Sequence, residues 1–242
     1  DGGSTDGTAE IIERYAERHP HIRWVSEEDK GQSDALNKGI SMARGEILAI
    51  LNVDDFYEPN VLNRVSEIFK GLSEPALLVG NCNIWDDNGD LVHLNKPAKL
   101  NLSDLLSGYR ANPWPVNPSA YFYHPSLHQQ IGPYNVKDHH TLDVDFLLRA
   151  VQVANVRYVD EVWGNFRLIE GTKTAVDTKR GEDDSRVKSL MKSYRKTLPL
   201  PERWKSALKY EFYNTGTWRR VRHFLKEPSE FLPALASKLR RI

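Results

Sequence analysis

The sequence predicts an α/β fold with a parallel sheet, on three observations. Helical and strand-like segments alternate along residues 8–79, which is typical of βαβ units. The run 46–51 is almost continuously apolar, as expected for a strand buried in a parallel sheet. The composition, with 40% hydrophobic and 27% charged residues over 242 positions, is that of a globular protein and excludes collagen-like and disordered chains.

The first half of the chain supplies the alternating elements. A turn cluster at 1–7 leads into the first helix, whose apolar residues recur at helical spacing. The predicted elements are a helix at 8–18, a strand at 22–25, a helix at 31–44, a strand at 46–51, a helix after Pro59 and a strand at 76–79.

The second half predicts a different pattern. Residues 84–94 read as a hairpin, because Asn88-Gly89 is a strong two-residue turn signal. A rigid, proline-rich connection follows at 112–118. The further predicted elements are a strand at 120–123, a helix at 125–131 closed by Gly132, a helix at 141–150, strands at 156–159 and 162–168, and charged helices from about 180.

Cysteine and hydropathy patterns bear on the compartment. Cys82 is the one cysteine, so no intrachain disulfide can form, which fits a reducing compartment. No apolar run approaches the roughly 18–20 residues that span a bilayer, and no signal peptide is visible. We therefore expect a cytoplasmic protein. The chain starts at Asp1, inside a loop-like motif, which predicts a fragment or processed chain.

The net charge of zero conceals an asymmetry. Residues 1–185 hold 18 basic and 29 acidic residues, a net charge of −11, whereas residues 186–242 hold 15 and 4, a net charge of +11. Two interpretations of the basic region stay open: peripheral contact with an anionic membrane, or packing on the acidic body. Nucleic acid is not expected, because no known motif accompanies the charge. The apolar residues of this region include Trp204, Leu208, Phe212, Trp218, Phe224 and Leu225.

The first candidate motif is Asp1–Thr8 at a helix entry. Its glycines let the backbone approach a ligand closely, and a helix N-terminus favours anions. Asp1 could accept hydrogen bonds from a base or ribose. The alternative is a plain turn with Asp6 or Thr8 as the helix cap.

The second motif is Asn52-Val-Asp-Asp55, which follows the run 46–51. Ligands bind outside the carboxyl ends of strands in open α/β sheets. Adjacent carboxylates repel each other there, and Mg²⁺ or Mn²⁺ would relieve the repulsion while sharing substrate phosphates. The alternative is a solvated turn in which Asp54 caps the next helix.

Two helical segments complete the set. Asp145 and Arg149 lie four residues apart and can pair, which leaves Asp143 free to act as a base; a capping acid beside an ion pair is the alternative. In the segment 26–39, Asn37 and Gly39 are poor helix formers, and close approach to a backbone or ligand would explain them.

Together and in this order, the four motifs resemble those of the family 2 glycosyltransferases of the GT-A fold. The resemblance runs from Asp1 to about Thr174. Asp1–Thr8 is similar to the nucleotide-contacting loop, Ser26–Gly39 to the block that follows it, Asn52–Asp55 to the metal and diphosphate motif, Asp143–Arg149 to the segment with the catalytic base, and Phe166-Arg167 with Thr172-Lys-Thr174 to the stretch that closes the core.

The resemblance implies a GT-A-like (Rossmann-like), mostly parallel sheet flanked by helices. It implies a catalytic domain at 1–175 that lacks its first strand or strands, and a charged, mainly helical extension at 176–242. In the family, a strand, a helix and a second strand precede the glycine-rich loop, so we expect an exposed strand edge and exposed apolar surface.

The implied activity is inverting transfer of a sugar from a nucleoside diphosphate sugar to an acceptor hydroxyl. A uridine donor is favoured, the acceptor is a sugar or a lipid-linked molecule, and the setting is polysaccharide or glycoconjugate synthesis. The implied cofactor is Mn²⁺ or Mg²⁺, which acts as a Lewis acid on the leaving diphosphate.

The resemblance also implies residue roles. Asp55 would hold the metal, and Asp143 would take the proton of the acceptor hydroxyl, with Asp145 as the reserve. Arg149 would orient the helix of Asp143 or assist the phosphates. The implied nucleotide-sugar-binding residues are Asp1, Gly3, Ser4, Asp6, Asp29, Gly31, Asp34, Asn37 and Asp54.

The sequence also bears on three other function classes. A non-catalytic GT-A-like module would bind sugar, nucleotide or a partner without turnover. A nucleotidyltransferase lacks support, because no glycine-rich triphosphate loop with basic residues is visible. A glycoside hydrolase would use two acids and leave the Asn52–Asp55 motif without a role.

Overall fold

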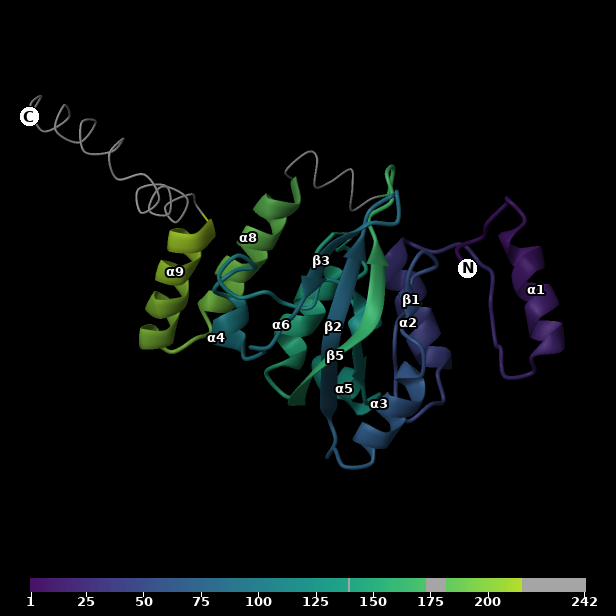
Figure 1. Ribbon diagram of the computed structural model, residues 1–242, viewed down its shortest axis with the longest axis horizontal. Coiled ribbons are helices and arrows are strands. Elements are labelled where there is room, and N and C mark those ends of the chain that lie inside the picture. The colour runs from purple at the N-terminus through teal and green to yellow at the C-terminus, as the bar shows by residue number, and fades with distance from the viewer. Residues whose placement is uncertain (139, 173–181, 215–242) are drawn as a thin grey trace, which may run out of the picture.

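The computed structural model describes residues 1–138, 140–172 and 182–214, and its described core is a mixed sheet between helices (Figure 1). In chain order the elements are α1 (Thr8–Arg18), α2 (Gln32–Met42), β1 (Phe56–Tyr57), α3 (Val61–Phe69), β2 (Ala76–Trp85), β3 (Leu91–Asn95), α4 (Leu102–Leu105), a 3₁₀ turn (Pro118–Ala120), β4 (Tyr121–Tyr123), α5 (Ser126–Ile131), α6 (Leu142–Ala150), β5 (Asn155–Arg167), α8 (Glu182–Arg195) and α9 (Leu200–Asn214).

The sheet confirms the α/β class but is mixed, whereas a mostly parallel sheet was expected. Its strand order is β1-β5-β2-β3, and β4 also pairs with β2. Among the described strands only β2 and β5 are parallel; the other three pairings are antiparallel. For β2 and β3 the reason is local: the tight turn between Asp86 and Asp90 returns the chain directly, and a short connection can only make an antiparallel pair.

The expected strand at 46–51 is wrong for the described structure. Its one ladder contact is an isolated bridge, in which the amides of Leu48 and Tyr123 donate to each other's carbonyls at 2.7 and 3.0 Å. Leu48 is buried, but Leu51 is 46% exposed. An apolar run predicts extended backbone, yet a strand also needs a partner on its edge. Residues 22–25 likewise form no strand, and the two strands expected at 156–168 are the single strand β5.

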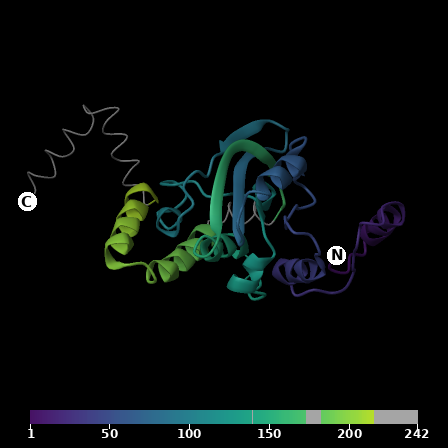
Figure 2. The same cartoon turned by 90° about the horizontal axis from the view of Figure 1, so that it is seen from below.

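Alternating residues of β2 build the core on both faces of the sheet. Leu77 and Val79 pack with Phe146 of α6, and Ala76 and Leu78 pack in a second cluster with α3. Figure 2 shows the strands between these two helices. The sheet therefore holds the segments before α3 and before α6 in one rigid frame.

The helices expected at 8–18, after Pro59, at 125–131 and at 141–150 are confirmed, as is the hairpin at Asn88-Gly89. Helix α5 ends at Gly132, whose φ of 78° lies in the left-handed region that glycine adopts most readily. Local spacing and capping thus predict these elements well.

Helices α8 and α9 pack on the body of the protein. The Tyr194 hydroxyl donates to Asp145 at 2.7 Å, and the Arg195 guanidinium donates to the Leu106 carbonyl at 2.7 Å. The predicted boundary at 175, together with Lys173, Thr174, Trp218, Phe224 and Leu225, lies outside the described residues. Within the described chain, no helix combines the length and apolarity that a membrane span requires.

Replacing Gly80 by Ala is expected to lower the free energy of unfolding by about 1–3 kcal/mol. A Cβ at Gly80 would lie 2.4 Å from a ring carbon of Trp163, which is buried at 1% exposure and has little room to move. The matched control is Gly39→Ala in α2, where a Cβ meets nothing within 4 Å. Urea unfolding checks both: the control should be neutral or stabilising by about 0.5–1 kcal/mol, and equal effects at the two positions would contradict the prediction.

Candidate functional site

The glycine-rich loop is organised around the Asp1 carboxylate. Its two oxygens accept hydrogen bonds from the Gly3 and Ser4 amides at 3.0 Å and from the Ser4 and Ser26 hydroxyls at 2.5 Å. Asp1 therefore holds the loop against residues 25–27. Asp6 instead accepts the Thr8 amide and hydroxyl at the start of α1, which is the capping role weighed for it.

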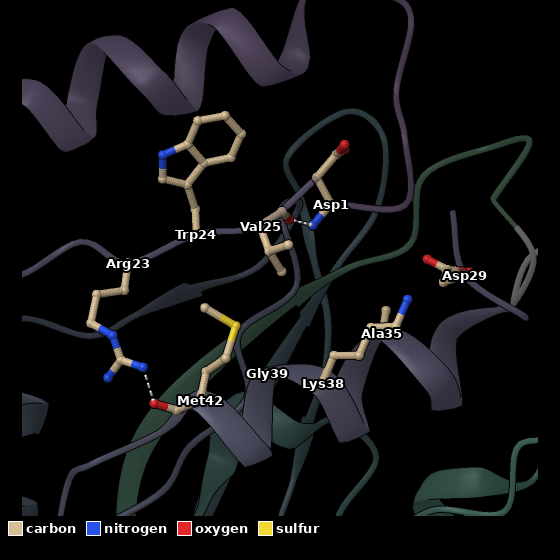
Figure 3. Close-up of a pocket in the computed structure, with 9 residues that line it drawn as sticks. All are labelled: Asp1, Arg23, Trp24, Val25, Asp29, Ala35, Lys38, Gly39 and Met42. Atoms are coloured by element: carbon tan, nitrogen blue, oxygen red, sulfur yellow. Dashed lines mark hydrogen bonds between the residues drawn. The ribbon is translucent and has the colours of Figure 1, made fainter. Parts of the chain in front are cut away.

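A pocket of about 200 Å³ opens between this loop and α2 (Figure 3). Of the predicted nucleotide-binding residues, Asp1 and Asp29 line it. Asp29 also accepts the Gly31 amide at 2.7 Å, which shapes the turn into α2. The pocket is lined by Asp1, Arg23, Trp24, Val25, Asp29, Ala35, Lys38, Gly39 and Met42.

Lys38 of α2 is the basic residue that lines this pocket together with Arg23. Its ammonium lies 2.9 Å from a Glu27 carboxylate oxygen and 3.6 Å from Asp34, and it donates to the Glu28 carbonyl at 2.9 Å. The chain of Lys38 extends from α2 along the pocket toward the side where Asp29 lies (Figure 3). The Lys38 ammonium is thus held at the edge of the pocket by Glu27 and Asp34.

Asn37 faces away from that pocket and ties α2 to the loop before α6. Its side-chain amide pairs with the backbone of Tyr134 in both directions, each bond 2.9 Å long. One turn earlier, the Ser33 hydroxyl donates to the Asp138 carbonyl at 2.8 Å. The poor helix former at position 37 thus has a structural reason, and α2 links the pocket to the loop that leads to Asp143.

Asp55 is a buried carboxylate with one oxygen satisfied. Asn52 and Asn117 donate to its Oδ2 at 2.7 and 2.8 Å, while no described residue donates to the buried Oδ1. Burial raises the pKa of Asp55, and these two hydrogen bonds oppose the rise. An unpartnered carboxylate oxygen fits a hard divalent cation, which prefers oxygen ligands.

The small number of protein ligands near Asp55 is also compatible with a divalent cation. Within the described part of the chain, no group of three or more His, Cys, Asp or Glu side chains is placed so that it could hold a metal ion by itself. Mg²⁺ and related cations are often held by one or two carboxylates together with substrate phosphates. Asp54 is beside Asp55 and half-buried, and Arg167 of β5 donates to the Asp54 carbonyl at 2.8 Å, which fixes this turn against the sheet.

Asp143 lies in the first turn of α6 and is half-buried. Burial, together with the nearby charges of Asp55 and Asp138, raises its pKa to about 6. Among the described residues, none donates a hydrogen bond to its carboxylate. The structure therefore brings Asp55 and Asp143 within electrostatic reach and leaves Asp143 available to a substrate hydroxyl.

Asp145 and Arg149 act as a connection between helices. Arg149 donates to Asp145 at 2.8 Å, as the spacing predicted, and to the Ile131 carbonyl at 2.8 Å. The other Asp145 oxygen accepts the Tyr194 hydroxyl. With both oxygens engaged, Asp145 is less available as a base than Asp143. Arg149 ties α6 to the end of α5, and its buried Nη2 has no hydrogen-bond partner among the described residues.

Sequence reasoning missed Asn117, Trp24 and Arg23. Asn117 ends the proline-rich connection, and the repeated Asn-Pro pairs at 112 and 117 are the one local signal that could have found it. Trp24 stands within a segment read only as a strand. Trp114, in the proline-rich connection, packs edge-on against Tyr109 and on the core cluster around α6.

Comparisons with known proteins bear on the family and the fold of the chain. The model of the family "Glycosyl transferase family 2" matches residues 1–116. A PGL/p-HBAD biosynthesis glycosyltransferase of Mycobacterium bovis is 31% identical over 186 residues, covering 73% of this chain and 67% of the relative. Chondroitin synthase of Escherichia coli is 26% identical over 186 residues, covering 73% of this chain but only 25% of the larger protein.

Two solved structures share the fold. S. aureus TarS 1–349 in complex with UDP-GlcNAc matches 90% of this chain and 63% of its own, with a TM-score of 0.65 and 17% identity. The mannosyltransferase PcManGT from Pyrobaculum calidifontis, in complex with GDP-Man and Mn²⁺, matches 100% of this chain and 70% of its own, with a TM-score of 0.58 and 19% identity.

Proposed function

This chain belongs to glycosyltransferase family 2 and has the GT-A fold, and on that premise we propose that it catalyses inverting transfer of a sugar from a nucleoside diphosphate sugar to an acceptor hydroxyl. The observation that carries the proposal is that two carboxylates with different surroundings lie within electrostatic reach of each other. Asp55 is buried with one oxygen unpartnered, and Asp143 lies nearby with no described donor.

Asp143 is proposed as the general base. It removes the proton of the acceptor hydroxyl as the oxygen attacks the anomeric carbon from the face opposite the diphosphate. A base is most effective when its pKa lies near the working pH, and burial has moved the pKa of Asp143 in that direction. Arg149, through Asp145 and the end of α5, keeps the helix of Asp143 in place.

Asp55 is proposed to hold Mn²⁺ or Mg²⁺, with Asn52 and Asn117 fixing its carboxylate and Asp54 next to the sugar or ribose. A bound cation would supply Lewis-acid stabilisation of the charge on the leaving diphosphate.

The nucleotide is proposed to occupy the pocket beside Asp1 and Lys38. We favour a uridine donor, and an acceptor that is a sugar or a lipid-linked molecule of polysaccharide or glycoconjugate synthesis. The two similar solved structures are complexes with UDP-GlcNAc and with GDP-Man, which supports testing both nucleotide classes.

Nucleoside diphosphate release tests the function directly. The chain is incubated with a panel of UDP- and GDP-sugars and hydroxyl acceptors, with Mn²⁺, Mg²⁺ or EDTA. We expect release from one donor class that requires a divalent cation, with inversion at the anomeric carbon of the product. Binding of a nucleotide sugar without release, with acceptors present and the protein folded, would instead support a non-catalytic binding module.

A further inference from the structure

Helix α9 turns one face toward the body. Ser206, Tyr210 and Asn214 lie four residues apart on that face. Arg195 of α8 donates to the Ser206 hydroxyl at 3.2 Å and stacks over the Tyr210 ring at 4.4 Å. Asn214 donates to the Ser107 carbonyl at 3.1 Å. Ser206 is buried by these contacts, and Tyr210 and Asn214 are half-buried.

The outer face carries an apolar stripe of Leu200, Trp204 and Leu208, called here the α9 stripe. Its members are offset by two residues from the inner face, about 200° around the helix, so they point away from the body. Their exposed fractions are 67%, 67% and 66%. Figure 1 shows α9 at the outer edge of the described residues, with α8 between it and the sheet. Nothing in the described chain covers this stripe.

Cations flank the α9 stripe. Lys196, Arg203 and Lys205 are exposed, and none of them pairs with an acid among the described residues. Residues 186–214 contain eight basic and two acidic residues, a net charge of +6. An apolar row with tryptophan at its centre and basic residues beside it matches the composition of helices that lie in a bilayer interface. The positive charge selects an anionic surface.

The size of the stripe argues against a protein partner. A stable interface between two copies takes roughly 20–30 residues a side, whereas the stripe has three large apolar side chains. A bilayer imposes no such requirement, because lipid adapts to a small apolar row. We propose that the α9 stripe docks this protein on an anionic lipid bilayer, with Trp204 at headgroup depth. The proposal does not depend on the transferase activity.

Vesicle flotation with the full 242-residue chain tests the proposal. Vesicles of phosphatidylcholine alone are compared with vesicles containing 30% phosphatidylglycerol, at low and high salt. The stripe variant is Leu200→Ser/Leu208→Ser, and the matched control is Leu62→Ser/Leu91→Ser, which replaces two leucines that are 59% and 53% exposed elsewhere. Both variants keep every basic residue, including those after residue 214.

We expect the wild type and the control to float with anionic vesicles in a salt-sensitive manner, and the stripe variant to bind about tenfold or more weakly. Brominated lipid should quench the tryptophan fluorescence of the wild type, and Trp204→Phe should lack the quenched component. Equal flotation of the stripe variant and the control, or no flotation of the wild type, would overturn the proposal. A wild type that self-associates in sedimentation, and a stripe variant that does not, would assign the stripe to a second copy instead.

Discussion

Replacing Asp143 by Asn is expected to lower kcat for sugar transfer by about 10²–10⁴-fold, the usual contribution of a general base. Asparagine keeps the shape of the side chain but cannot take a proton. Donor affinity should stay nearly unchanged, because the proposed nucleotide pocket is built from other elements. Nucleoside diphosphate release under saturating donor, with donor binding measured by titration calorimetry, separates the two effects.

The control is Asp145→Asn, two residues further along α6. Asp145 holds Arg149 and Tyr194, so this variant should lose about 1–2 kcal/mol of unfolding free energy and little of kcat. A larger kcat loss in Asp145→Asn than in Asp143→Asn would reassign the base.

The same residue sets the expected pH dependence. As the proposed base, Asp143 would act as the carboxylate. Burial and the nearby charges raise its pKa to about 6 in the metal-free protein, so kcat/KM should fall about tenfold per pH unit below that value. A cation on Asp55 offsets the charge that raises this pKa, so saturating Mn²⁺ should move the midpoint to lower pH. A profile without this acidic limb would contradict the assignment.

Features that depend on neighbours in sequence could be predicted from the sequence. The helix at 8–18 follows from apolar spacing, the hairpin from Asn88-Gly89, and the Asp145–Arg149 pair from four-residue spacing on one helix. The order of four short motifs was enough to predict the family and the GT-A fold. Those inferences use only separations that the chain itself fixes.

Features that depend on partners distant in sequence could not be predicted from the sequence. Asn117 reaches Asp55 across 62 positions, and Asn37 reaches Tyr134 across 97. The run 46–51 failed as a strand for the same reason, because its hydropathy says nothing about whether a neighbouring strand is present. The roles of side chains within the site depend on such pairings, which only the folded chain displays.

Replacing Asp55 by Asn is expected to abolish metal-dependent activity, with a loss of about 10²-fold or more. The carboxylate would become a neutral amide, and the buried Oδ1 position would carry a weaker ligand for a hard cation. Mn²⁺ binding in the presence of nucleoside diphosphate, followed by electron paramagnetic resonance, should weaken in parallel. Folding should be preserved. Burial raises the pKa of Asp55, which means that the folded protein disfavours the charged carboxylate. Replacing it by a neutral amide should therefore cost little free energy of unfolding.

Asn117→Ala provides the graded comparison for this site. Asn117 donates to the Asp55 oxygen opposite the unpartnered one, so its loss frees the carboxylate to rotate without removing the ligand. Supporting residues of this kind change metal affinity by about 10–100-fold, and raising Mn²⁺ should restore much of the lost activity. Excess Mn²⁺ should not rescue Asp55→Asn. Full activity of Asp55→Asn in EDTA would mean that the carboxylate holds the turn and no metal, and the catalytic assignment would then depend on Asp143 alone.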